Sequence, residues 1–298
     1  MESLVINVIT AFFLRNKISI DEIGKPYLGD ACVVIPIVIK NQKYYCKLFA
    51  NSSKNKIDSE IVFVDYLRKN GIIVPEYLVI ENKKTFFTES SQLPYYFYLT
   101  KEIINDGDTA IMSDGLVKEI IKHVSDLHLK TLSFSQELPG ITIISDYQNL
   151  ITLYLKYSKL FDNCQMTECI IKILEQVPDQ YTVHPIHSDI YSANIFTRNG
   201  HFVAFVDFSD LRFSGFEDDL GKLFQNLIGA KEVPIEQIDR YISLYEQYTS
   251  FSLSKKNLCI SIFYHILERF VDKSIYGVEQ EYKTKVLEIL IRLIDHFI

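Results

Sequence analysis

The chain has 298 residues, enough for a sizeable core and for two lobes, because single domains commonly run from about 50 to 250 residues. Its formal net charge of −7 argues against nonspecific nucleic-acid binding, which depends on a basic surface. Hydrophobic residues make up 48% of the chain and charged residues 23%, so we expect a folded globular protein without extended disorder.

Three features bear on the compartment in which the chain works. Its five cysteines are scattered through apolar segments, which is typical of thiols in a reducing compartment. The first residues lack the basic region and cleavage site of a secretory signal. No apolar run approaches the roughly 20 residues needed to span a bilayer. We therefore expect a cytoplasmic location, no membrane association, and a monomer or weak dimer.

The first hundred or so residues predict a mixture of helices and strands. Apolar residues recur at helical spacing over residues 2–15, and a second helix is expected over residues 59–69, where Asn70-Gly71 ends it. Apolar, β-branched and aromatic runs predict strands. These runs cover residues 31–39, 43–49, 78–80, 85–88 and 93–100.

The remaining two thirds of the chain read as mostly helical. The clearest helix is predicted over residues 114–131, where Leu116, Val117, Ile120, Ile121, Val124 and Leu127 repeat at helical spacing. Further helices are expected over residues 146–161, 167–176, 218–227, 235–248, 255–271 and 279–297. One stretch interrupts this pattern, near residues 183–208.

That stretch combines polar residues with a predicted hairpin. His187-Ser188-Asp189 is followed at Asn194 by a short strand, the turn pair Asn199-Gly200, and a second strand that ends at Asp207. Folding at the turn returns Asp207 to the vicinity of Asn194. Amide and carboxylate oxygens at a strand end suit Mg²⁺, which takes few protein ligands and leaves room for substrate phosphates.

The spacing H-x-D-x-x-x-x-N, followed by an apolar strand and Asp, resembles the catalytic segment of the protein-kinase-like fold. In detail it resembles the aminoglycoside phosphotransferase and choline kinase-like family. That branch usually has a second His upstream, as at His184, and here the strand ends in Asp207-Phe208. Gly215 to Gly221 resembles its Asp-Leu element. The match is specific over residues 183–221 and follows element order elsewhere.

The resemblance implies an α+β fold with two lobes. An antiparallel-sheet N-terminal lobe over residues 1–101 would bind the nucleotide, and a mostly helical C-terminal lobe over residues 102–298 would carry the catalytic and acceptor sites. It also implies a Mg²⁺-dependent transfer of phosphate from ATP or GTP. Asp189 would accept or orient the proton of the attacking hydroxyl, and Asn194 and Asp207 would hold Mg²⁺. His187 and Asp219 would support the catalytic loop.

The resemblance further implies nucleotide contacts in the first lobe. Lys47 would reach the α- and β-phosphates, with Glu60 as its candidate ion-pair partner. The turn at Gly29 would cover the phosphates, although one glycine is a weak signal. Backbone groups at Glu102 and Ile104 would meet the purine, which is why the side chains there do not distinguish ATP from GTP.

Three acidic residues after the metal ligands border the expected acceptor pocket. Asp210, Glu217 and Asp218 would attract the ammonium groups of a cationic acceptor. A solvated acidic loop accounts for them equally well, and Arg212 among them weakens a purely cation-binding reading.

We therefore predict a kinase of a small hydroxylated molecule. An aminoglycoside is the preferred acceptor, because the double-His segment and the compact length look most like those enzymes. Two alternatives stay open. One is a kinase of choline, homoserine, a macrolide or a sugar on the same fold. The other is a kinase-like binding protein without catalysis, against which the presence of Lys47, Asp189, Asn194 and Asp207 argues.

Overall fold

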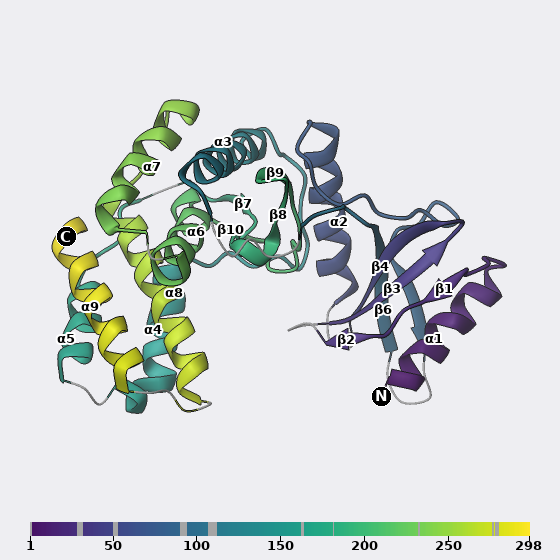
Figure 1. Cartoon of the computed structure of the whole chain (residues 1–298), viewed down its shortest axis with the longest axis horizontal. Coiled ribbons are helices and arrows are strands. Elements are labelled where there is room, and N and C mark those ends of the chain that lie inside the picture. Colours follow the sequence, from purple (N-terminus) through teal and green to yellow (C-terminus); the bar gives the residue numbers. More distant parts are fainter. Residues whose placement is uncertain are drawn as a thin grey trace. The chain divides into compact units, whose positions relative to one another are not determined.

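A computed structural model describes most of the chain. The described residues are 2–28, 32–49, 53–89, 94–106, 112–161, 164–180, 182–231, 233–275, 277 and 280–298. The chain divides into two compact units (Figure 1). Unit 1 comprises Met1–Asn105, Ser135–Ile141 and Ala204–Ser209, and unit 2 comprises Asp106–Phe134, Thr142–Val203 and Asp210–Ile298.

Unit 1 is built on a six-stranded antiparallel sheet. Its main path has the order β1-β3-β4-β6-β5, and β2 also pairs with β3. The strands are β1 (Glu22–Ile23), β2 (Tyr27–Leu28), β3 (Val33–Ile39), β4 (Gln42–Phe49), β5 (Phe86–Glu89) and β6 (Pro94–Lys101). Lys40 and Asn41, with φ of 51° and 61°, form the tight turn between β3 and β4, which places Lys47 opposite Val34 and Tyr98.

Helix α1 (Glu2–Arg15) lies beside this sheet (Figure 1). Its buried apolar side chains share one core with those of the strands. That core consists of Val5, Ile9, Phe13, Ile35, Ile37, Ile39, Cys46, Leu48, Phe86, Phe97 and Leu99. Helix α2 runs over Lys54–Lys69. The predicted start at Ser59 is wrong, because Ser53 caps the helix by accepting a hydrogen bond from the Lys56 amide.

Two later segments belong to unit 1. The hydroxyl of Ser59 donates to the carbonyl oxygen of Pro139 at 2.9 Å, and the amide of Phe205 donates to that of Ile73 at 3.2 Å. The rings of Phe63 and Phe208 lie 6.1 Å apart. Asp207 therefore shares a unit with Lys47, although the two lie 160 positions apart in the sequence (207 − 47).

Unit 2 is mostly helical. Its α-helices are α3 (Asp114–Thr131), α4 (Asp146–Tyr157), α5 (Cys164–Leu174), α6 (Phe216–Lys231), α7 (Ile235–Thr249), α8 (Lys255–Ile275) and α9 (Gln280–Phe297). The 3-10 turn η1 (Ser158–Phe161) extends α4. Helices α6 and α8 approach so closely that a Cβ added at Gly221 would lie 1.9 Å from the hydroxyl oxygen of Ser261.

The helical pattern of unit 2 is interrupted by short strands and a 3-10 turn. Strand β7 (His184–Ile186) pairs antiparallel with β10 (Arg212–Ser214). The turn η2 (Ser192–Asn194) leads into the hairpin of β8 (Ile195–Arg198) and β9 (His201–Phe205). Asn199 and Gly200, with φ of 52° and 76°, form the predicted turn.

The predicted α+β class is confirmed, with an antiparallel sheet in the N-terminal part and helices in the C-terminal part. The chain first passes from unit 1 to unit 2 between Asn105 and Asp106, against a sequence-predicted boundary after residue 101. Across the residues that the structure describes, every helix falls short of the length or apolar character that crossing a membrane requires.

Candidate active site

In unit 1, Lys47 and Asp207 form an ion pair. Lys47 projects from β4 with a side chain that is 15% exposed, and its Nζ lies 2.7 Å from Asp207 Oδ1. Asp207 follows β9 with a φ of 63°, a left-handed conformation that is unusual for a residue other than glycine. Burial would lower the pKa of Lys47, but the charges of Asp207 and Glu60 outweigh it and hold that pKa above its usual value. Lys47 therefore stays charged.

Glu60 lies on α2 and is 5% exposed. Its Oε1 accepts hydrogen bonds from the hydroxyls of Tyr98 at 2.7 Å and Tyr77 at 3.2 Å. Burial raises the pKa of Glu60 to about 6, although the charge of Lys47 opposes that rise. Among the described ion pairs, Lys47 is joined to Asp207 and not to its expected partner Glu60, whose carboxylate is held by the two tyrosines.

The remaining predicted nucleotide contacts are Glu102 and Ile104, which follow strand β6, and Gly29. The Glu102 carboxylate pairs with Lys43 Nζ at 2.7 Å, and its amide donates to the Lys43 carbonyl oxygen at 3.0 Å. A purine contact by Glu102 would therefore use its carbonyl oxygen. Ile104 is 62% exposed. Gly29 lies outside the described residues. The roles of these three residues stay predictions.

In unit 2, hydrogen bonds close the loop that carries Asp189. Asn194 Nδ2 donates to Asp189 Oδ2 at 2.7 Å and to its carbonyl oxygen at 3.0 Å. The Asn194 amide N–H donates to the Tyr191 carbonyl oxygen at 2.9 Å, which forms η2. Because the Nδ2 group is engaged in this way, the side-chain oxygen of Asn194 is the atom that could serve a cation.

Asp219, in the first turn of α6, lies against the start of the same loop. It is fully buried, its Oδ2 accepts from the His187 amide at 3.0 Å, and its Oδ1 accepts from the Ser188 amide. His128 Nε2 lies 3.1 Å from the same Oδ2. Burial would raise the pKa of Asp219, but the hydrogen bond and charge of His128 outweigh burial and lower it. This carboxylate therefore fixes the backbone immediately before Asp189.

Ser188 has a φ of 73°, which turns its amide and that of His187 toward one carboxylate. His187 is fully buried, and its Nδ1 lies 3.3 Å from the Asp189 amide that donates to it. The His187 side chain thus supports the loop from inside.

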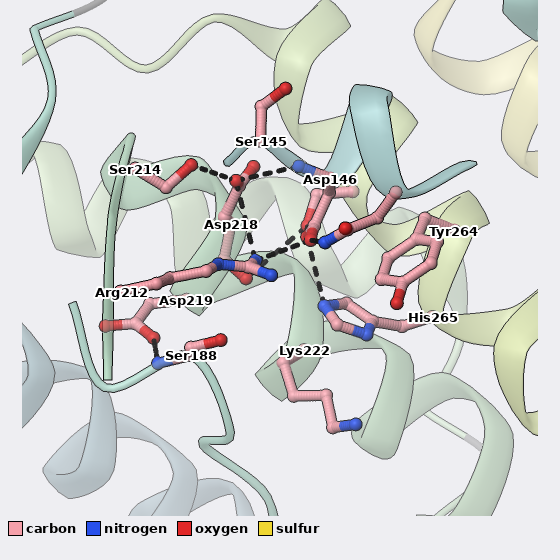
Figure 2. Close-up of polar contacts among 12 residues, drawn as sticks. Ser145, Asp146, Ser188, Arg212, Ser214, Asp218, Asp219, Lys222, Tyr264 and His265 are labelled. Carbon is pink, nitrogen blue, oxygen red and sulfur yellow. Dashed lines mark hydrogen bonds and ion pairs between the residues drawn. The ribbon is translucent and has the colours of Figure 1, made fainter. Parts of the chain in front are cut away.

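The predicted acceptor residues have different surroundings. Asp210 is exposed. Glu217 is buried and its Oε1 accepts from the Ser254 amide at 3.0 Å. Asp218 is buried, and Figure 2 shows its carboxylate facing Arg212, Ser214 and the Asp146 amide. Burial and the charge of Asp146 raise the pKa of Asp218 to about 8. Acceptor binding by these residues stays a prediction.

Sequence reasoning missed the contacts of four residues in unit 2, of which it had named only Arg212. Lys222 reaches Asp189, and Arg212, Asp146 and His265 form a buried cluster (Figure 2). Lys222 comes one helical turn after Asp219, which was the available signal for it. Asp146 and His265 come from helices far apart in sequence, and no local motif links them.

The donor chemistry fits a hard cation with few protein ligands. Asn194 offers an amide oxygen and Asp207 a carboxylate, both of which suit Mg²⁺. Among the described residues no cluster of three or more His, Cys, Asp or Glu side chains could hold a metal, so a cage made wholly of such side chains is not found there.

These features define a kinase-like phosphotransferase: a lysine on an antiparallel sheet, an aspartate loop braced from a helix, and an aspartate after a hairpin. The chain belongs to the phosphotransferase enzyme family, whose model matches residues 37–253. It is therefore a phosphotransferase with an alcohol group as acceptor, and the resemblance seen in the sequence is confirmed. No curated protein sequence matches the chain significantly.

Solved structures share the fold along nearly the whole chain. Amicoumacin kinase hAmiN, in complex with AMP-PNP, Ca²⁺ and Ami, is 14% identical with a TM-score of 0.68, covering 96% of this chain and 93% of that one. The microcompartment-associated aminopropanol kinase is 12% identical with a TM-score of 0.65, covering 96% and 94%. Wild-type aminoglycoside 2'-phosphotransferase-IIIa, as its GDP complex, is 14% identical with a TM-score of 0.64, covering 97% of both chains. At these identities the likeness shows the protein-kinase-like fold.

Proposed function

We propose that this enzyme transfers the γ-phosphate of ATP or GTP, in a Mg²⁺-dependent reaction, to a hydroxyl group of an aminoglycoside antibiotic. The observation that carries the proposal is the restraint of Asp189. Its carboxylate is held by Asn194, and the backbone before it is held by Asp219. Phosphoryl transfer asks a protein mainly for positioning and charge neutralisation, and this loop supplies positioning.

Each residue has a defined task in the proposed reaction. Asp189 accepts or orients the proton of the acceptor hydroxyl as its oxygen attacks the γ-phosphorus. Lys47, kept charged by Asp207, binds nucleotide phosphate oxygens. Asn194 and Asp207 hold Mg²⁺, which when bound neutralises phosphate charge. His187 supports the loop from within.

The acceptor class rests on the likeness of the catalytic segment to aminoglycoside phosphotransferases. Two of the structures cited above carry names of amine-containing acceptors, an aminoglycoside and aminopropanol, which supports a cationic substrate. A small amino alcohol is for this reason the second candidate. We further propose that the enzyme confers resistance to an aminoglycoside and works in the cytoplasm.

Nucleotide binding is tested first. Thermal unfolding is measured with Mg²⁺ and with ATP or GTP, and a rise in midpoint is expected for at least one nucleotide. A folded protein without response to either would contradict the enzymatic proposal and favour a non-catalytic kinase-like protein. Phosphate transfer is then measured across aminoglycosides, aminopropanol, choline, homoserine and macrolides. Strong turnover only outside the aminoglycosides would refute the acceptor assignment.

Two substitutions separate the assigned roles. Asp189→Ala should abolish turnover while nucleotide binding persists, whereas Asp207→Ala should weaken binding of the Mg²⁺–nucleotide complex. Asp239→Ala is the matched control, because its carboxylate forms exposed pairs with Lys255 and His296. Normal turnover in Asp189→Ala would show that the role assignment is mistaken.

A further inference from the structure

Lys222 places a positive charge directly beside Asp189. It lies on α6 with a side chain that is 19% exposed, and its Nζ is 3.3 Å from Asp189 Oδ1 and 3.5 Å from Glu268 Oε2. The ammonium also lies 5.7 Å from the centre of the Tyr191 ring. A largely buried ammonium stays charged where neighbouring carboxylates offset the free energy of its lost hydration.

Asp189 is consequently held at both carboxylate oxygens. Asn194, in the turn η2, donates from Nδ2 to Asp189 Oδ2 at 2.7 Å. Lys222, on helix α6, places its Nζ 3.3 Å from Asp189 Oδ1. An aspartate side chain has two rotatable bonds, and two partners on separate elements restrict both. Removing either partner should allow the carboxylate to turn.

Glu268 on α8 is itself held in place. Its Oε1 accepts from the Tyr264 hydroxyl at 2.6 Å, and its Oε2 lies 3.2 Å from His265 Nδ1. The other ring nitrogen of His265 lies 3.0 Å from Asp146 Oδ2. Figure 2 shows His265 and Arg212 converging on the Asp146 carboxylate. Lys222 therefore pairs with a carboxylate, that of Glu268, which is itself bound by buried residues of unit 2.

Neighbouring side chains form a row whose charges alternate in sign: Asp189, Lys222, Glu268, His265 and Asp146. Burial would lower the pKa of His265, but Asp146 and Glu268 outweigh it and raise it. Burial would raise the pKa of Glu268, yet the hydrogen bond and charge of His265, together with Lys222, lower it to about 2. The pKa of Lys222 is raised by Glu268 and Asp189 against burial. Each cation in the row thus lies between two carboxylates, an arrangement that favours one geometry.

We propose that Lys222 is a positioning residue for phosphoryl transfer, which orients the Asp189 carboxylate toward the acceptor hydroxyl while Glu268 holds Lys222. This inference rests on the proposed function, in which Asp189 meets that hydroxyl. A base must come within about 2.6–3.2 Å of the proton-bearing atom, and a misplacement of about 1 Å can lower a rate by roughly 10²-fold. The action of Lys222 is on the orientation of Asp189 and leaves nucleotide binding in unit 1 unchanged.

The kinetic test compares variants of Lys222 that keep or remove its charge. Lys222→Met preserves most of the side-chain length and should lower kcat by roughly 10- to 100-fold, with KM for the nucleotide changed less than about 2-fold. Lys222→Arg keeps the charge and should retain most of kcat. Lys255→Met is the matched control, since it removes an exposed ion pair with Asp239. A wild-type kcat in Lys222→Met would overturn the proposal.

A structural readout separates this inference from the proposed function. Crystal structures of the wild type, Lys222→Met and Lys222→Arg should show the Asp189 carboxylate rotated in the Met variant alone. An unmoved Asp189 in Lys222→Met would refute positioning. If the wild type phosphorylates no acceptor, the proposed function fails, and the crystal structures still decide the orientation of Asp189. Should Lys222→Met not fold, Glu268→Gln is measured in the same two ways, with the same displacement and loss of kcat expected.

Discussion

Replacing Asp219 by asparagine tests how this carboxylate supports the loop that carries Asp189. In the wild type, one carboxylate oxygen accepts from the Ser188 amide and the other from the His187 amide and His128. Asparagine keeps one acceptor oxygen and presents an NH₂ group in place of the other. At least one buried backbone amide then faces a donor.

The expected loss of local stability follows from the hydrogen-bond partners that Asp219→Asn removes. Leaving one buried amide unsatisfied costs about 1–3 kcal/mol, and hydrogen bonds to a neutral oxygen are weaker than those to a charged one by about 1 kcal/mol. We therefore expect Asp219→Asn to lower the local free energy of opening by about 2–4 kcal/mol. This corresponds to roughly 30- to 1,000-fold faster amide exchange in the loop.

Hydrogen exchange is the appropriate assay because the chain has two units, and a global melting curve would combine them. The amides of His187 and Ser188 should lose protection in Asp219→Asn, while those of β3 and β4 keep it. Asp239→Asn, at an exposed ion pair, should leave both regions unchanged. Equal protection of the two loop amides in wild type and Asp219→Asn would refute the reasoning.

Two further predictions concern stability. The pKa of Glu60 is raised to about 6 from 4.5, so the stability from its protonated form is present below about pH 4.5 and is lost as pH rises through about 6. The free energy of unfolding, measured by urea titration, should fall between about pH 4.5 and 6 by about 2 kcal/mol more in wild type than in Glu60→Gln. If this free energy depends on pH in the same way in both proteins, the raised pKa of Glu60 is contradicted. Gly221→Ala would place a Cβ 2.5 Å from that of Ser261, so urea unfolding should show about 1–3 kcal/mol of destabilisation. Ser261→Gly in the same chain should restore part of it, and full stability of Gly221→Ala alone would show that α6 and α8 separate readily.

Local sequence signals explain which elements could be predicted. Residues 114–131 were predicted as a helix and form α3 over Asp114–Thr131, because the apolar period is strong and Ser113 supplies the cap. The start of α2 could not be read in the same way. Residues 54–58 are mainly polar, and only the fold reveals that Ser53 caps them.

The same distinction applies to the candidate site. The loop from His187 to Asn194 and the aspartate that braces it lie in short motifs with fixed spacing, so sequence alone indicated them. The link from Asp189 through Lys222 to Glu268 joins a loop and two helices. Such a link depends on the register of α6 against α8, which sequence patterns do not determine.

The pairing of Lys47 with Asp207 gives these two positions a joint behaviour. The sequence assigned one to the nucleotide phosphates and the other to the metal, yet their side chains lie 2.7 Å apart in unit 1. Removing either charge leaves the other poorly compensated, so the two single substitutions perturb overlapping interactions. In the proposed function, the affinity for the nucleotide and the affinity for Mg²⁺ would therefore be coupled through this ion pair, and a double-substitution cycle would assign the share of each residue.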